Sequence, residues 1–407
     1  MPIIKNKPEL LAPAGNFEKL KIAIHYGADA VYLAGKEFSL RNFSGNFSEQ
    51  ELFDAVEYVH KKGKKIYLAL NIYSRNDEQE EIKTFLKKIN SIKPDAIIIS
   101  DPGIILMAQE IVPDIDIHLS TQSNTTNYNT ARFWKKLGIK RVNLARELSR
   151  DEVNKIASKS LIETEIFIHG AMCISYSGRC LLSSFYTLRD SNRGLCSHPC
   201  RWRYSIVEEM RPHEYYPIAE DNRGTYIFNS KDLCMLQNLP EVINTGVTSL
   251  KIEGRMKGVN YLAAVTKTYR QAIDSYCNDP SHFTIKPEWT KELDNVYHRR
   301  YCTGFFFDDP DQILPNYENR HDGEIHNFVG KIIEKHCNNE YQVEIRNSLQ
   351  KNDTIEILSP KRPLESVQIT EMFDLDHNPI DHAKPNTNSI LKIEIEADAK
   401  DIIRKIN

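Results

Sequence analysis

The sequence predicts an α/β protein: a barrel of eight parallel strands and helices, followed by a small antiparallel β-barrel domain. Two observations predict the first part, namely eight short apolar runs rich in β-branched residues and amphipathic stretches between most of them. Apolar strands that alternate with helices are typical of a parallel sheet covered on its faces. Eight such units match a (β/α)8, TIM-like barrel, although an open doubly wound sheet has the same periodicity.

The expected strands are the runs 9–15, 30–35, 65–72, 96–101, 117–122, 141–146, 165–170 and 249–255. The stretches 16–27 and 48–63 have the apolar spacing of helices, and each ends at Gly, a common helix terminator. Ser149 and Glu152 have the spacing of a capping box at the start of another helix. A further amphipathic helix is expected at 260–276.

The pattern changes after the last helix. From about residue 325, apolar and polar residues alternate in short runs separated by Asn, Asp, Pro and Gly: 328–335, 341–347, 353–359, 366–373 and 390–397. We therefore expect a barrel domain over 1–320 and a small β-barrel domain over 325–407. An insertion of 78 residues, at about 171–248, separates the seventh strand from the eighth and should lie above the carboxyl ends of the strands.

Composition restricts the class of protein. The 407 residues are 41% hydrophobic, which is enough for a sizeable core. The first residues lack the features of a signal peptide, and no apolar run is long enough to span a bilayer, so we expect a cytoplasmic protein without a membrane partner. Eight cysteines in a reducing compartment indicate metal binding or redox chemistry rather than disulfides.

Five of the eight cysteines lie in the insertion: Cys173, Cys180, Cys196, Cys200 and Cys234. Four thiolates can bind zinc or an iron–sulfur cluster, and the spacing of these residues matches neither the usual zinc pattern nor the ferredoxin pattern. They could also be small buried side chains. That interpretation is favoured for the isolated Cys277, Cys302 and Cys337.

The same insertion carries a basic stretch. Between residues 179 and 203 there are five arginines and one acid, Asp190. Arginines can contact phosphates and aromatic rings can stack on unpaired bases, so Arg179, Arg201, Trp202 and Arg203 are candidates for binding a nucleic acid. The alternative is a solvated loop with a few cation–π contacts.

Polar residues at strand ends form a second group of candidates. His169 and Gly170 end the seventh expected strand, Glu253 and Arg255 the eighth, and Arg146 and Glu147 the sixth, while Gln122 and Asn71 end the fifth and third. A hydrogen-bonded structural role is possible for each. Together, arginines at strand ends suit a small carboxylate ligand, because the guanidinium fork matches a carboxylate.

Four segments carry a family resemblance: residues 9–35, 165–184, 229–236 ("NSKDLCML") and 249–257 ("SLKIEGRMK"). The chain resembles the collagenase-like peptidase family of unassigned catalytic type, and within it the tRNA uridine hydroxylation proteins. The resemblance implies prephenate-dependent 5-hydroxylation of the wobble uridine of tRNA by a protein with an iron–sulfur cluster. The cluster is expected to be of the four-iron four-sulfur type. Related members hydroxylate a cytidine of ribosomal RNA.

Carried onto this chain, the resemblance makes Cys173, Cys180, Cys196 and Cys200 the expected cluster ligands. Cys234 is ranked below Cys200, because its apolar neighbours indicate a helix start with a buried thiol. His169, Glu253 and Arg255 are the expected catalytic residues. Prephenate carries two carboxylates, so cationic residues should bind it: Arg255, Arg146 and Arg41, in that order.

Two other functions remain open from the sequence. A peptidase would need a nucleophile with a base or a metal-bound water, and neither HExxH nor GxSxG is present. Thiolates that bind a cluster cannot also act as nucleophiles. The other alternative is a cluster-stabilised or zinc-stabilised RNA-binding protein without catalytic activity.

Overall fold

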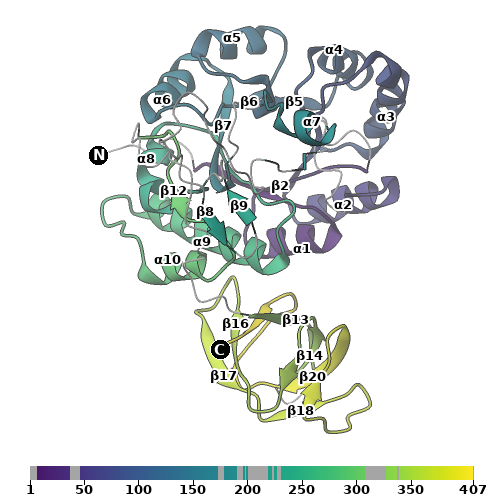
Figure 1. The fold of residues 1–407 in the computed structure, drawn as a ribbon, viewed down its shortest axis with the longest axis vertical. Coiled ribbons are helices and arrows are strands. Elements are labelled where there is room, and N and C mark those ends of the chain that lie inside the picture. The colour runs from purple at the N-terminus through teal and green to yellow at the C-terminus, as the bar shows by residue number, and fades with distance from the viewer. Residues whose placement is uncertain are drawn as a thin grey trace.

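The computed structural model describes residues 7–36, 46–172, 178–189, 196–197, 199, 219–221, 224–226, 231–307, 327–336 and 339–406. Its larger part is a parallel barrel inside a ring of helices, and its smaller part is an antiparallel β-domain (Figure 1). The predicted fold class is confirmed.

All eight expected barrel strands form. They are β1 (Glu9–Pro13), β2 (Ala30–Leu33), β3 (Lys65–Leu70), β4 (Ala96–Ile99), β5 (Asp116–Leu119), β6 (Arg141–Asn143), β7 (Glu163–Ala171) and β11 (Ser249–Ile252). Each pairs in parallel with the next, and β11 pairs in parallel with both β1 and β7. The sheet is therefore closed, which excludes the open doubly wound alternative.

Nine outer helices surround the barrel within the described residues. They are α1 (Phe17–His25), α2 (Glu49–Lys61), α3 (Gln79–Ile92), α4 (Pro102–Ile111), α5 (Tyr128–Lys136), α6 (Arg150–Lys159), α8 (Leu239–Asn244), α9 (Val259–Asn278) and α10 (Pro287–Asp294). Of these, α1, α2, α4, α5 and α6 begin at a polar residue whose side chain caps the helix. The side chain of Ser149 accepts a hydrogen bond from the amide of Glu152, and the Glu152 carboxylate bonds back, which confirms the predicted capping box.

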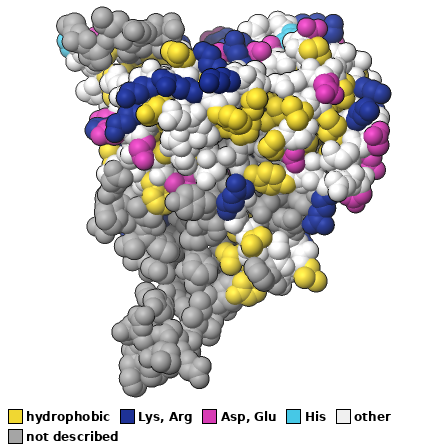
Figure 2. Space-filling view, turned by 90° about the horizontal axis from the view of Figure 1, so that it is seen from above, with side chains coloured by type: hydrophobic (Ala, Val, Ile, Leu, Met, Phe, Trp, Pro, Cys, Tyr) yellow, Lys and Arg dark blue, Asp and Glu magenta, His cyan; other side chains and the backbone are white. Residues whose placement is uncertain are grey.

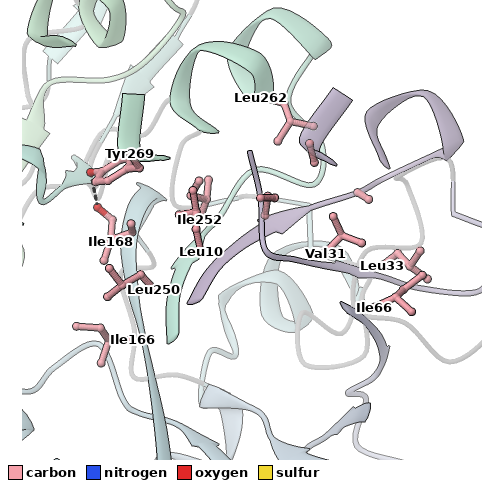
Figure 3. Packing of buried hydrophobic residues seen from close by; sticks show 14 of the residues in the cluster. Leu10, Val31, Leu33, Ile66, Ile166, Ile168, Leu250, Ile252, Leu262 and Tyr269 are labelled. Carbon is pink, nitrogen blue, oxygen red and sulfur yellow. Dashed lines mark hydrogen bonds between the residues drawn. The ribbon is translucent and has the colours of Figure 1, made fainter. Parts of the chain in front are cut away.

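The main core lies between the strands and the outer helices. Figure 3 shows side chains of β1, β2, β7 and β11 packed together with α9, including Leu10, Ile168 and Ile252. The hydroxyl of Tyr269 on α9 donates a hydrogen bond to the main-chain oxygen of Ile168, at 2.9 Å. Helix α9 is thereby fixed to β7, the strand that carries His169.

The barrel interior is polar at the amino ends of the strands. The Arg141 guanidinium contacts Glu9 at 2.6 Å, Glu163 at 2.9 Å and Glu165 at 3.5 Å. The Lys251 ammonium lies 2.9 Å from Glu165. Arg141, Glu165 and Lys251 are buried, so each needs its charged partner in the folded state. The network fixes one end of the barrel and leaves the carboxyl end for other side chains.

The insertion adds one strand to the barrel sheet, and the segment after α10 adds another. The strand β10 (Asp232–Cys234) runs antiparallel to the end of β7, and β12 (Tyr301–Cys302) pairs with β10. The expectation that Cys234 starts a helix was wrong, since it ends β10, and the 3-10 turn Leu236–Asn238 and α8 follow. The Asp232 carboxylate accepts hydrogen bonds from the guanidinium and the main-chain amide of Arg299. These contacts keep the pKa of the Asp232 carboxyl low despite its burial. The short helix α7 (Leu182–Thr187) and the strands β8 (Ala219–Asp221) and β9 (Gly224–Tyr226) also belong to the insertion.

The C-terminal domain is a seven-stranded antiparallel sheet with its own core. Its strands are, in sheet order, β17 (Glu365–Gln368), β16 (Thr354–Leu358), β21 (Ile402–Lys405), β13 (Asn327–Lys335), β14 (Glu340–Ile345), β20 (Thr387–Lys392) and β18 (Glu371–Phe373). A small pair, β15 (Leu349–Gln350) and β19 (His382–Ala383), accompanies the sheet. The strand β21 was not among the expected runs, yet it lies between β16 and β13.

The two parts of the chain are in direct contact near α1 and α10 (Figure 1). The fully buried Arg404 of β21 binds Glu292 of α10 through two hydrogen bonds, of 2.8 and 2.9 Å. The Tyr26 hydroxyl accepts from the amide of Ile402, at 3.0 Å, and donates to the main-chain oxygen of Leu358, at 2.5 Å. Buried polar contacts of this kind hold the β-domain against the barrel.

Candidate functional site

The carboxyl rim, meaning the carboxyl ends of the barrel strands, brings together polar residues from distant parts of the sequence. Arg146 follows β6, His169 lies near the end of β7, and Glu253 and Arg255 follow β11. Because β7 pairs with both β6 and β11, these positions are neighbours at one part of the rim. In barrels of this class the reactive groups usually lie at this end.

The Glu253 carboxylate is held by a tyrosine from the barrel interior. The Tyr32 hydroxyl, on β2, lies 3.0 Å from Oε2 of Glu253 and 3.1 Å from the main-chain oxygen of Ile252. The Lys251 ammonium lies 4.4 Å from the centre of the Tyr32 ring, at cation–π distance. The carboxylate is thus oriented toward the barrel axis, where it can accept or release a proton.

Arg255 lies deeper than its position at a strand end suggests. Arg255 is 3% exposed, and its main-chain oxygen accepts a hydrogen bond from the Lys19 ammonium at 3.1 Å. A β-carbon at Gly15 would lie 2.3 Å from this same oxygen, so no larger residue fits there without a backbone shift. The glycine of "LAPAG" therefore lets the loops after β1 and β11 approach closely.

Arg146 lines a pocket at the ends of β6 and β7. Its guanidinium lies 3.9 Å from the centre of the Phe167 ring and donates a hydrogen bond to the main-chain oxygen of Ala171, at 3.3 Å. The other walls are largely apolar and come from β6, β7, β10 and the segment after β12: Leu144, Ile166, Met172, Leu233, Met235 and Phe306. The cavity volume is about 30 Å³, so the pocket in this form holds only water-sized molecules, and a ring-bearing carboxylate would require it to widen.

The His169 side chain faces α9 and β12. It is 1% exposed and lies among the rings of Tyr261, Tyr269 and Tyr301, whose centres are 5.4 to 5.8 Å from its own. Burial lowers the pKa of His169 to about 3, a tendency that nearby Asp232 opposes and His298 reinforces. The imidazole is therefore neutral near pH 7. Its buried Nε2 has no hydrogen-bond partner among the residues that the structure describes.

Part of the cysteine-bearing insertion docks on the carboxyl rim. A β-carbon at Gly178 would lie 2.6 Å from the main-chain oxygen of Gln122, after β5, and the exposed Arg179 contacts the hydroxyl of Tyr73, after β3, at 3.5 Å. Cys180 comes next and directly precedes the α7 segment. In Figure 1, α7 lies inside the ring of outer helices.

Cys196 lies beside the same short helix. The amide of Ser197 donates to the Ser183 hydroxyl of α7 at 3.0 Å, and the Ser197 hydroxyl lies 2.8 Å from that of Thr187. Cys180 and Cys196 are both half-buried. The structure thus brings two of the four expected thiol ligands to α7. The other two, Cys173 and Cys200, lie outside the described residues, as do Arg41, Arg201, Trp202, Arg203 and Cys337.

Comparison with protein families covers nearly the whole chain. The model described as "Peptidase family U32" matches residues 15–316, and that of the "Peptidase family U32 C-terminal domain" matches residues 324–404. This chain belongs to peptidase family U32. The resemblance inferred from the sequence motifs is confirmed.

The U32 relatives with curated names include RNA hydroxylation proteins. The chain is 40% identical to tRNA hydroxylation protein P1 of Bacillus subtilis over 388 residues, which cover 94% of this chain and 90% of that protein. It is 36% identical to tRNA hydroxylation protein P of Escherichia coli, over 87% of each chain. The 23S rRNA 5-hydroxycytidine C2501 synthase of Escherichia coli is 34% identical over 68% of this chain and 40% of that protein.

Three further cysteines of this U32 chain, Cys234, Cys277 and Cys302, lie within the described residues. Burial raises the pKa of the Cys234 thiol to about 11 and also raises those of Cys277 and Cys302. A metal ligand must be deprotonated, and a raised pKa opposes this. The ranking of Cys234 below Cys200 stays a prediction.

Strand-end positions alone reveal neither the part that Tyr32 plays in the U32 site nor the hydrogen bond that Gln122 makes. Tyr32 lies inside an apolar run, where alternation of side chains along the strand could have placed it in the barrel interior. Gln122 is buried and accepts from the Ser100 hydroxyl at 3.1 Å, which indicates a structural role. For both residues the hydrogen-bond partner comes from a different strand, so the pair is visible only in three dimensions.

The buried His169 should make the protein sensitive to acid. Its pKa is about 3 in the folded state and about 6.5 when unfolded, so the unfolded state binds the extra proton between these values. The contribution of His169 to the free energy of unfolding is fully present above about pH 6.5. It is lost progressively as the pH falls from there toward 3. Between pH 7 and pH 5 the wild type should lose about 2 kcal/mol more unfolding free energy than His169→Gln, measured by urea denaturation.

The matched control for this measurement is His282→Gln, because His282 is exposed. It should keep the acid sensitivity of the wild type. Equal losses in His169→Gln and the wild type would contradict a buried neutral imidazole at position 169.

Proposed function

We propose that this protein is a tRNA-modifying enzyme that hydroxylates C5 of the wobble uridine, with prephenate as co-substrate and an iron–sulfur cluster as cofactor. The observation that carries the proposal is the 40% identity to tRNA hydroxylation protein P1, over 94% of the chain. This similarity includes both the barrel and the β-domain. It therefore supports the same type of substrate better than a match confined to one domain would.

Two alternatives have less support. Hydroxylation of ribosomal RNA is suggested by a relative that matches 68% of this chain, and this chain spans 40% of that relative's length. Peptidase activity is suggested by the family name, but the sequence has neither HExxH nor GxSxG. The tRNA substrate is thus favoured among the three.

The cluster would be held by Cys173, Cys180, Cys196 and Cys200. In support, Cys180 and Cys196 lie beside α7, in a segment that docks on the carboxyl rim through Gly178. Thiolates are the usual ligands of such clusters, and when bound the cluster would supply one-electron transfer. The residues of this chain would bind the cluster and position the insertion over the rim.

Prephenate would bind through arginines of the carboxyl rim. Arg146 is half-buried and stacks on Phe167 in an apolar pocket, whereas Arg255 is almost completely buried. The guanidinium of Arg146 can bind a carboxylate, and its apolar pocket, with a cavity volume of about 30 Å³, would have to widen to admit the ring. Glu253, oriented by Tyr32, is the nearby group that can take up or release a proton.

The proposed function is tested by mass spectrometry of nucleosides from a deletion strain. We expect 5-hydroxyuridine and its derivatives to disappear from tRNA and to return when the wild-type chain is supplied. Unchanged tRNA nucleosides would refute the proposal. Loss of a hydroxycytidine from ribosomal RNA instead would favour the second alternative.

The role of the two arginines can be tested separately from the fold. Arg146→Lys and Arg255→Lys should each raise the prephenate concentration needed for half-maximal hydroxylation by about tenfold, because Lys cannot reproduce a bidentate contact. Cluster content should stay unaltered. The measurement is hydroxylation in vitro against prephenate concentration, with thermal stability recorded in parallel.

Arg150→Lys is the matched control, because Arg150 is exposed and pairs with the neighbouring Asp151. It should leave the prephenate response unchanged. For either rim arginine, lower thermal stability with a wild-type prephenate response would assign that residue a structural role.

A further inference from the structure

A basic face lies on the outside of the barrel, over α5 and α6. We call it the α5–α6 basic face, and it consists of Arg132, Lys135, Lys136, Lys140, Lys155 and Lys159, all of which are exposed. Residues 124–140, which include all of α5, contain four of these cations and no acidic residue. The chain as a whole has a net charge of −3, so this local excess is not a property of the average surface.

The cations of this face have no carboxylate partner in the part of the chain that the structure describes. Among the residues that the structure describes, none of the six forms an ion pair with a carboxylate. Lysines on other helices do, as in Lys61 with Glu57 and Lys88 with Glu49. The two acids of α6 lie in its first turn, one turn before Lys155, and are engaged by other groups: Asp151 pairs with Arg150, and Glu152 accepts a hydrogen bond from the cap residue Ser149.

Two of the six cations also support the local structure. Arg132 donates to the main-chain oxygen of Lys159, at 2.9 Å, and the Lys135 ammonium donates to that of Leu161. These contacts satisfy carbonyl groups at the end of α6 and after it but leave the positive charges uncompensated. Lys136 and Lys155 make no such contact in the described structure, so they can be changed without removing a cap.

Aromatic and apolar side chains accompany the charges. Phe133 is 55% exposed and Leu137 is 41% exposed, and the Tyr128 ring lies 5.3 Å from the Arg132 guanidinium and 5.4 Å from the Lys159 ammonium. Figure 2 shows a row of Lys and Arg side chains beside a hydrophobic patch on the side of the molecule that includes these helices. A surface of cations and rings fits a nucleic acid, whose backbone is a polyanion.

The position of the face limits the ligand. Helix α5 follows the carboxyl end of β5 and ends before the amino end of β6, and nine residues of helix extend roughly 13 Å. Lys136 and Lys140 are therefore displaced from the carboxyl rim toward the opposite end of the barrel. A molecule that reaches both the rim and this face must be elongated and anionic.

We infer that the α5–α6 basic face binds the phosphate backbone of tRNA outside the anticodon loop, while the anticodon lies at the carboxyl rim. The inference rests on the proposed function, since it takes tRNA as the substrate. The contact is with phosphates, so it strengthens binding and sets the orientation of the tRNA without reading its sequence.

The test uses the full chain and two double variants of equal charge change. Lys136→Glu with Lys155→Glu alters the face, and Lys83→Glu with Lys87→Glu, both exposed on α3, is the control. Binding of an unmodified full-length tRNA transcript and of a short anticodon stem-loop is measured across salt concentrations. The face variant should bind full-length tRNA at least about tenfold more weakly, with a salt slope reduced by roughly 2, and bind the stem-loop like the wild type.

Three results would overturn the inference. One is that the face variant binds full-length tRNA as the α3 control does. Another is equal weakening toward tRNA and stem-loop, which would place the contact at the anticodon. The third is normal tRNA affinity with loss of modification in cells, which would assign the face to an acidic protein partner. Failure of the wild type to bind any tRNA would instead refute the proposed function.

Discussion

Replacing Glu292 by Gln should lower the free energy of unfolding by about 3–5 kcal/mol, because it leaves a buried guanidinium without its carboxylate. Arg404 is fully buried, and both of its terminal nitrogens donate to Glu292, at 2.8 and 2.9 Å. Arg stays protonated in proteins, so it cannot relieve the lost pairing by becoming neutral. The effect should appear in urea denaturation at pH 7 as a lower midpoint.

The position of this pair gives the measurement a second readout. Glu292 belongs to α10 of the barrel domain and Arg404 to β21 of the β-domain. Loss of the pair should therefore weaken the attachment of the β-domain and make limited proteolysis of the chain faster. Glu288→Gln on the same helix is the control, because Glu288 is exposed, and it should change neither property.

The double variant Glu292→Leu with Arg404→Met separates charge from packing. It removes both ions at once, so it should recover most of the stability lost in Glu292→Gln. A single variant as stable as the wild type would contradict the buried pair. If the double variant loses as much unfolding free energy as the single variant, the effect comes from packing and not from charge.

The barrel was predictable from the sequence because its strands are local features. Each parallel strand is a short apolar run between turns, and this holds for Ala96–Ile99 and Ser249–Ile252 alike. Closure of the sheet was not predictable, because it depends on the pairing of β11 with β7 across the whole insertion. The strands β10 and β12 were missed for a related reason, since two or three residues are too short to show a period of two.

The candidate site was predictable as a set of positions, and its side-chain directions were not. Parallel strands end at one rim, so Arg146, His169 and Glu253 were expected to be neighbours. The register between β11 and β7 shifts at Lys251 and Ile252, and Ile252 pairs with His169. Such an irregularity breaks the alternation of side chains, and His169 accordingly packs against α9 and β12.

The proposed cluster gives the largest expected effect on activity. Cys180→Ser and Cys196→Ser should each lose most of the iron and sulfide of anaerobically purified protein, together with its visible absorption, because a hydroxyl replaces a thiolate ligand. Hydroxylation of tRNA should fall at least about 100-fold, since loss of a ligand is more severe than the 10-fold to 100-fold effects of changing residues around a metal site.

The controls for this experiment are Cys277→Ser and Cys302→Ser. Burial raises the pKa of both thiols, which disfavours the thiolate that a cluster requires, so both variants should keep wild-type iron and sulfide. A Cys180 or Cys196 variant with full iron and sulfide content would show that the residue is not a ligand. A wild-type protein that is colourless and contains zinc would refute the iron–sulfur proposal and favour a zinc-stabilised RNA-binding protein, because zinc undergoes no redox chemistry.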